Sequence, residues 1–166
     1  FIVRLFIIQH DCGHGSFFNS RKANDTVGMI CGAVTLVSYR YWRKSHALHH
    51  AHSADLGERG MGDVWTLTVD EYLNAPRKQR IAYRIFRNPI VLFGIAPTVH
   101  FLIMHRWPLA ANEKYSQAER RSVWWNNLAI LTIMAVAISL IGFKAFLIVF
   151  LPSAIIAGTV GTWLFY

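Results

Sequence analysis

The sequence predicts an all-α integral-membrane protein with two full membrane-spanning helices. Hydrophobic residues make up 54% of its 166 residues and charged residues only 16%. Residues 122–143 and 145–166 are two uncharged runs of 22 residues each, separated only by Lys144. At ~1.5 Å per residue, either run is long enough as a helix to cross a hydrocarbon core about 30 Å thick. A soluble protein of this size rarely needs two such helices side by side.

Three shorter apolar segments precede these two runs. Residues 1–9 are expected to be the last turns of a membrane helix, with the Arg4 side chain reaching toward the interface. Residues 26–39 are apolar for only 14 residues, which is too short to cross the bilayer comfortably. Residues 88–104 form a run of 17 that two prolines, a glycine and a histidine interrupt. The last two segments are therefore predicted to be re-entrant or interfacial.

The polar segments carry most of the charge. Residues 40–87 and 106–121 are polar, and the formal net charge of the chain is +8. Lysines and arginines cluster beside apolar segments, which fits a cytoplasmic face held against anionic lipid headgroups. No nucleic-acid-binding motif accompanies this charge, so nucleic acid is not an expected partner. Cys12 and Cys31 form neither a CxxC pair nor a disulfide framework and are interpreted as packing residues.

The first of two histidine groups is His10 and His14, with Asp11 and Gly13 between them. Residues four apart on a helix lie about 40° apart on one face, so both imidazoles can point at one site. Alone this spacing is common by chance. It also mimics a zinc protease motif, but Asp11 stands where that motif needs glutamate and Gly13 weakens the helix.

The second group is more crowded. His46, His49 and His50 fall within an arc of about 100° on a helix, and His52 lies toward the edge of that arc. Core packing does not require three imidazoles on one face, whereas a metal ion does. We therefore interpret the first three as candidate ligands and His52 as a residue behind the ligands or on the surface.

Together the two groups offer five facing histidines. One zinc ion takes at most four ligands in a structural site and three in a catalytic site. Five ligands therefore predict two metal ions or a larger site, and imidazole ligation alone suits iron, copper, zinc or nickel. Both groups border apolar segments, which suits chemistry on a lipid-borne substrate.

These motifs resemble those of a known family. Residues 10–18, HDCGHGSFF, resemble the first histidine box of membrane fatty acid desaturases, and residues 42–53, WRKSHALHHAHS, resemble the second. Residues 62–68, with Glu71 and Tyr72, are similar to a stretch of the omega-6 (delta-12) desaturases, particularly bacterial ones. The resemblance covers nearly the whole chain.

The resemblance implies a centre of two iron ions that uses O2 to remove two hydrogens from an acyl chain carried by a lipid or a thioester. Electrons would come from a ferredoxin or a cytochrome b5. The iron ligands would be His10, His14, His46, His49 and His50, with no catalytic residue separate from them. Residues placed to support the imidazole rings would be Asp11, His52, Asp55 and Asp63.

The resemblance also predicts how much of a desaturase these 166 residues cover. Residues 1–166 are expected to be a single desaturase domain, truncated at both ends. The family's third box, a further HxxHH near the C-terminus, is absent from this sequence, as is any cytochrome b5 segment. The 166 residues alone are therefore expected to be inactive.

A shared metal site constrains the membrane topology. Both boxes must lie on one side, so residues 26–39 cannot cross the membrane once. A third box on the same side would need an even number of crossings after residue 52, which residues 122–143 and 145–166 supply, so residues 88–104 should not span. This arrangement places 15 of the 17 lysines and arginines on the cytoplasmic side, as the positive-inside rule expects.

Two other functions compete with this interpretation. An alkane or carotenoid hydroxylase of the same histidine-box superfamily would share the metal site but leave oxygen in its product. A non-catalytic membrane metal-binding protein, such as a transporter or sensor, would have acidic residues or histidines within its spanning helices. Residues 122–143 and 145–166 contain neither, which counts against the second alternative.

Overall fold

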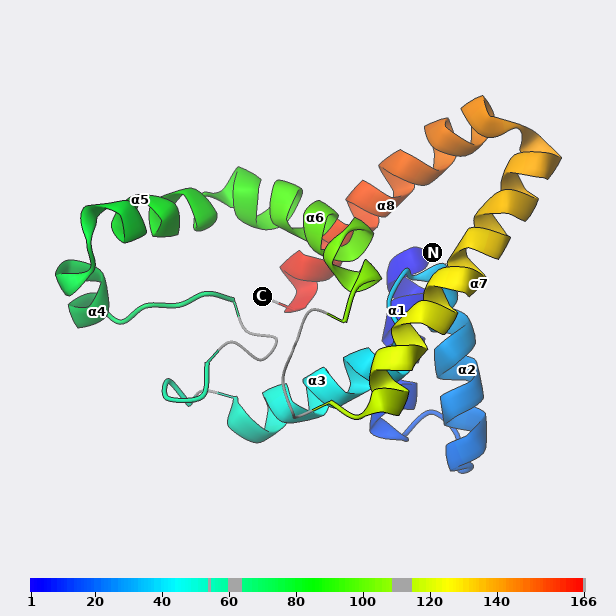
Figure 1. Ribbon diagram of the computed structural model, residues 1–166, viewed down its shortest axis with the longest axis horizontal. Helices are drawn as coiled ribbons and strands as arrows, with labels where there is room; N and C mark the ends of the chain where they lie inside the picture. The colour runs from blue at the N-terminus through cyan, green and yellow to red at the C-terminus, as the bar shows by residue number, and fades with distance from the viewer. Residues whose placement is uncertain (54, 60–63, 109–114, 166) are drawn as a thin grey trace.

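A computed structural model describes residues 1–53, 55–59, 64–108 and 115–165, which form helices joined by turns and loops and contain no β-strand. The helices are α1 (Ile2–His14), α2 (Arg21–Val34), α3 (Tyr39–His52), α4 (Val69–Asn74), α5 (Arg77–Phe86), α6 (Ala96–Leu102), α7 (Gln117–Ile141) and α8 (Phe143–Phe165). A π-helical turn, Val91–Ile95, precedes α6, and a 3₁₀ turn, Met104–Arg106, follows it. The predicted all-α fold is confirmed (Figure 1).

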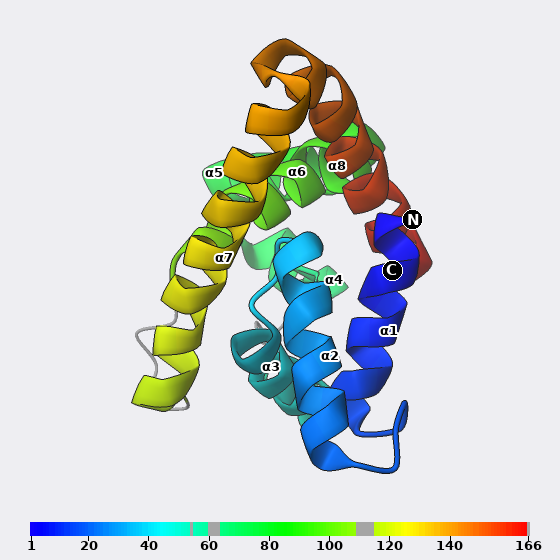
Figure 2. The same ribbon diagram turned by 90° about the vertical axis from the view of Figure 1, so that its right-hand side faces the viewer.

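Helices α7 and α8 are candidate membrane spans within the described residues. Both are long and apolar enough to cross a bilayer, which confirms the two predicted spans. They are antiparallel, and their turn lies at the opposite end of the molecule from α3 (Figures 1 and 2). Gly142 makes this turn with φ 79°, a conformation that strains any residue with a Cβ atom. Many of their large apolar side chains are exposed, as expected of a surface that faces lipid.

The short helices α1, α2 and α3 pack beside this pair. Helix α2 ends at Val34, so the apolar segment 26–39 is not one helix. The chain turns at Thr35 and Leu36, where Leu36 has φ 65°, and α3 begins at Tyr39. A helix as short as α2 reaches only about 21 Å, less than the thickness of a hydrocarbon core.

The close approach of α2 and α3 depends on Gly28. A Cβ atom at Gly28 would lie 2.3 Å from Cε2 of the Tyr39 ring, and Tyr39 is only 2% exposed. We expect Gly28→Ala to destabilise the fold by about 1–3 kcal/mol, because the ring has no free space to move into. Gly161→Ala is the matched control, since a Cβ atom there meets nothing within 4 Å. Thermal unfolding in detergent would measure both, and an equal loss in the control would contradict this account.

The interrupted segment 88–104 is helical from residue 89 to residue 102, but a π-helical turn interrupts its α-helical geometry. Pro97 lies in the first turn of α6, where it has no N–H to donate to the preceding turn, and the π-helical turn lies directly before it. The segment Val91–Arg106 also bends by 65° relative to α5. A third crossing would require α5 and this bent segment to act together as one span.

Candidate metal centre

Four imidazoles meet where the end of α1 faces α3. His14 Nε2 lies 3.3 Å from His10 Nε2 and 3.1 Å from His46 Nε2, and His46 Nε2 lies 3.1 Å from His50 Nε2. The four ligand nitrogens all lie within 4.8 Å of one another. Two imidazole nitrogens bound to one ion at about 2.1 Å would lie roughly 3.0–3.4 Å apart. The spacing of this four-histidine cluster therefore fits a single metal ion.

The surroundings favour the neutral form of two of these imidazoles, those of His14 and His46. Burial, reinforced by His10, His50 and the other neighbouring histidines, lowers the pKa of His46 to about 4. Burial and the same two neighbours also lower the pKa of His14. A neutral imidazole keeps a lone pair free for a metal ion, so these two rings are suited to metal binding at neutral pH.

The structure does not bring all five predicted ligands to one point. The His49 ring centroid lies 6.2 Å from that of His46 and 5.8 Å from that of His50, and His49 lies outside the cluster. The reason is helical geometry. Positions 46 and 50 form one stripe on α3 facing α1, whereas position 49 is turned about 60° to the other side of position 46.

The residues predicted to support the rings differ in their placement. Asp11 Oδ1 lies 3.2 Å from His10 Nδ1, so an N–H there donates to the carboxylate and leaves the Nε2 lone pair facing the cluster. Asp55 instead accepts from the Gly57 backbone N–H at 2.8 Å. His52 ends α3 outside the cluster, and Asp63 lies outside the described residues.

A cavity of about 1280 Å³ adjoins the cluster. Its walls combine three groups of residues: histidines of α1 and α3, polar residues that follow α3, and apolar residues of α6 and α8. The histidines among the lining residues are His10, His46, His49 and His50 of α1 and α3, together with His100 of α6. Representative apolar residues are Pro97, Phe101, Ala154, Ala157 and Gly158. The space has the size and apolar character of a site for a large apolar ligand.

Comparison with known proteins decides the family. The sequence profile described as fatty acid desaturase matches residues 1–166. A fatty acid desaturase of Bacillus subtilis is 42% identical over 167 residues, which cover all of this chain and 46% of that relative. The chain belongs to the fatty acid desaturase family.

Other relatives of the chain carry more specific names. An sn-1 oleoyl-lipid 12-desaturase of Synechocystis is 34% identical over 60% of this chain and 27% of its own length. An sn-1 acyl-lipid omega-3 desaturase (ferredoxin) of Nostoc is 34% identical over 59% of this chain and 28% of its own length. The chain thus spans less than half the length of these relatives. No solved structure matches it.

A polar clamp that the sequence did not predict holds the two histidine-bearing helices together. The Arg43 guanidinium of α3 pairs with the Asp25 carboxylate of α2. The Tyr39 hydroxyl lies 3.1 Å from Asp25 Oδ1 and 2.9 Å from the carbonyl oxygen of Cys12. Cys12 lies between His10 and His14 on α1, so the clamp fixes one pair of imidazoles relative to the other.

We expect Tyr39→Phe to weaken metal binding by the full-length protein about 10-fold, in the range typical of residues that orient ligands. The ring that packs on Gly28 is retained, so only the hydroxyl contacts with Cys12 and Asp25 are lost. A Co²⁺ titration followed by visible absorption measures both affinity and ligand geometry. Tyr41→Phe is the control, because Tyr41 stacks on Tyr115 instead. Unchanged affinity with lowered thermal stability would show that the clamp is only structural.

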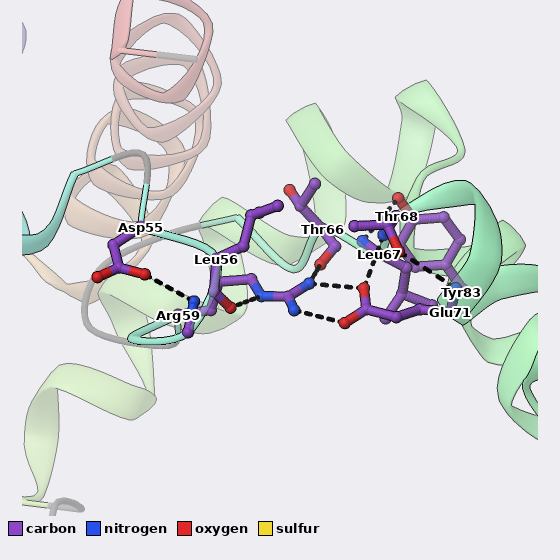
Figure 3. A network of polar contacts seen from close by, with 9 residues as sticks. Asp55, Leu56, Arg59, Thr66, Leu67, Thr68, Glu71 and Tyr83 are labelled. Atoms are coloured by element: carbon purple, nitrogen blue, oxygen red, sulfur yellow. Dashed lines mark hydrogen bonds and ion pairs between the residues drawn. The ribbon is translucent and has the colours of Figure 1, made fainter.

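A second network joins Arg59, which follows α3, to Thr66 and to Glu71 of α4 (Figure 3). The Arg59 guanidinium donates to both carboxylate oxygens of Glu71, at 2.8 and 2.5 Å, and to the carbonyl oxygen of Thr66 at 2.7 Å. The hydrogen bonds from Arg59 lower the pKa of the Glu71 carboxyl to about 2, and a hydrogen bond from the Thr68 backbone N–H acts in the same direction. Arg59 and Thr66 line the large cavity. The stretch similar to the omega-6 desaturases therefore contributes to the cavity wall.

Proposed function

We propose that the full-length protein is an O2-dependent fatty acyl desaturase that inserts a cis double bond with two iron ions and two electrons. The observation that carries this proposal is the four-histidine cluster beside a large, mainly apolar cavity in a chain of this family. Imidazole is a ligand that iron accepts. The cluster contains no cysteine, so it offers no thiolate that O2 chemistry would oxidise.

Each part of the site has its own task in this proposal. The cluster of His10, His14, His46 and His50 holds one iron ion, and His49 is a ligand of the second. Asp11 fixes the His10 ring through Nδ1. When bound, the iron ions supply the O2 activation needed to remove two hydrogens from an unactivated acyl chain. The apolar walls of α6 and α8 hold that chain and exclude water.

We further propose omega-6 (delta-12) regiochemistry, with the active site on the cytoplasmic face and residues 1–166 within one desaturase domain. The similarity of residues 62–68, with Glu71 and Tyr72, to omega-6 enzymes favours this choice, and one relative is named as a 12-desaturase. The acyl substrate is lipid-borne or a thioester. The electron donor is a ferredoxin or a cytochrome b5, and the Nostoc relative is named with ferredoxin.

Expression of the full-length protein in a host that lacks delta-12 desaturation tests the proposal. We expect a new diunsaturated fatty acid in membrane lipids and about two irons per chain by mass spectrometry of the purified protein. A hydroxylated fatty acid would instead assign the protein to the hydroxylases of the superfamily. One zinc ion and no iron would contradict the proposed metal centre, and a double bond at another position would refute only the regiochemistry.

A further inference from the structure

A second hollow, of about 370 Å³, lies between α2, α3 and α7. It shares no lining residue with the cavity beside the histidines. In Figure 2, α7 runs past α2 and α3 before it continues to the turn at Gly142. This hollow, which we call the α7 groove, is lined by Met29, Ala33, Ser38, Tyr39, Arg40, Ala118, Arg121, Ser122, Trp125, Asn126 and Ala129.

The charge of the α7 groove is wholly positive. Arg40 comes from the first turn of α3 and Arg121 from the start of α7, and no acidic residue lines the groove. Within the described part of the chain, neither arginine pairs with a carboxylate. The nearby Glu119 carboxylate accepts from the Ser116 backbone N–H at 2.7 Å, within the cap of its own helix. The two arginines therefore remain available to an anion from outside the described residues.

A buried amide adds a further polar donor. Asn126 Nδ2 is buried and forms no hydrogen bond within the described structure. The two hydroxyls of Ser38 and Ser122, by contrast, lie 3.0 Å apart and pair with each other. A buried N–H group without an acceptor is unfavourable. A ligand with oxygen atoms would satisfy the amide and neutralise the two arginines together.

The location of the groove identifies the class of ligand. Arg121 directly precedes the uncharged run 122–143, so it lies where α7 enters the membrane. Trp124 and Trp125 follow, 54% and 68% exposed, as is typical of tryptophans at the level of lipid headgroups. Beyond them the groove wall becomes apolar through Ala129 of α7, with Ala33 of α2 opposite. The groove is thus cationic at the interface and apolar toward the bilayer.

We propose that the α7 groove binds an anionic glycerophospholipid, with its phosphate between Arg40 and Arg121 and an acyl chain along Ala33 and Ala129. Basic pockets beside membrane helices recognise anionic headgroups in this way. The bound lipid would join α7 to the first turn of α3, the helix that carries His46 and His50. Tyr39 lines the groove and also belongs to the clamp on α1. The proposal does not depend on the desaturase activity, because it concerns a separate site.

The test uses the delipidated full-length protein in detergent, titrated with phosphatidylglycerol and followed by native mass spectrometry and thermal unfolding. We expect the double variant Arg40→Gln, Arg121→Gln to bind phosphatidylglycerol about 10- to 30-fold more weakly, and to lose the rise in unfolding temperature that this lipid gives the unchanged protein. The matched control, Arg77→Gln with Lys78→Gln, removes the same charge from α5 outside the groove and should bind normally. Ala129→Leu fills the groove without changing charge and should weaken binding too, which keeps the test decisive if the double variant misfolds.

Three competing ligands complete the experiment. Phosphatidylcholine and diacylglycerol should bind at least 10-fold more weakly than phosphatidylglycerol, and inorganic phosphate should not displace the lipid. Equal binding of phosphatidylcholine would overturn the preference for anionic lipid. Displacement by inorganic phosphate at similar concentration would identify a free-anion site instead. If the α5 control variant bound phosphatidylglycerol as weakly as the groove variant, the loss of binding would reflect general electrostatics. That result would overturn the proposed site.

Discussion

Replacing His46 with alanine in the full-length protein is expected to reduce desaturation at least 100-fold and to remove the metal ion of the four-histidine cluster. His46 is the central member, because its Nε2 lies 3.1 Å from both His14 Nε2 and His50 Nε2. Its ring also stacks on Trp42, with centroids 4.6 Å apart. An alanine would therefore leave three ligands and an empty space where the α1 and α3 histidines meet. Product analysis and iron content per chain measure the two effects.

The other histidines make this prediction specific. Alanine at His10, His14, His49 or His50 is also expected to abolish desaturation, whereas His52→Ala should retain a substantial part of it. Iron content separates the roles: His49→Ala should keep about one iron per chain, because the cluster does not include His49. Loss of activity in His52→Ala as severe as in His46→Ala would show that the ligand set extends beyond the five histidines. Full iron content in His46→Ala would refute the cluster as a metal site.

Helical periodicity explains why the sequence predicts part of this site but not all of it. Spacings of three and four residues show which imidazoles share a face of α1 or α3, since that depends only on local geometry. These spacings do not show which part of that face the other helix approaches. In the structure, α1 approaches positions 46 and 50 of α3, and position 49 lies outside the cluster. Hydropathy likewise predicts α7 and α8, because an uncharged run of 22 residues has few alternatives to a spanning helix.

The contacts that hold the site together are long-range and have no local pattern. Asp25 reaches Arg43 across 18 residues, and Tyr39 reaches Cys12 across 27. Within their own segments, Asp25, Arg43 and Tyr39 look like ordinary polar or aromatic residues. Nothing within its own apolar segment distinguishes Gly28, yet its missing side chain lets the Tyr39 ring enter between the helices. Such pairings arise from tertiary packing, so a single sequence does not predict them.

The membrane topology can be tested without reference to activity. We expect residues 20, 45 and 116 to be cytoplasmic and the turn at 142–144 to be on the opposite side. The histidines of α1 and α3 meet within 4.8 Å, so the loop after α1 and the middle of α3 must share one side. Helix α2 reaches only about 21 Å, short of a hydrocarbon core of about 30 Å. By contrast, α7 has 25 residues and its turn lies far from α3 (Figure 2).

Single cysteines, introduced after replacement of Cys12 and Cys31, would report each side through a membrane-impermeant thiol reagent applied to intact cells. Ser20 and Ser116 cap α2 and α7, so the cysteines are best placed at the exposed neighbours Arg21 and Gln117. Position 144 is preferable to 142, because Gly142 needs its positive φ. We expect labelling at position 144 alone in intact cells, and at positions 21, 45 and 117 only after the cells are opened. Labelling at 45 but not at 21 in intact cells would put the two histidine groups on opposite faces, which a shared metal site does not allow.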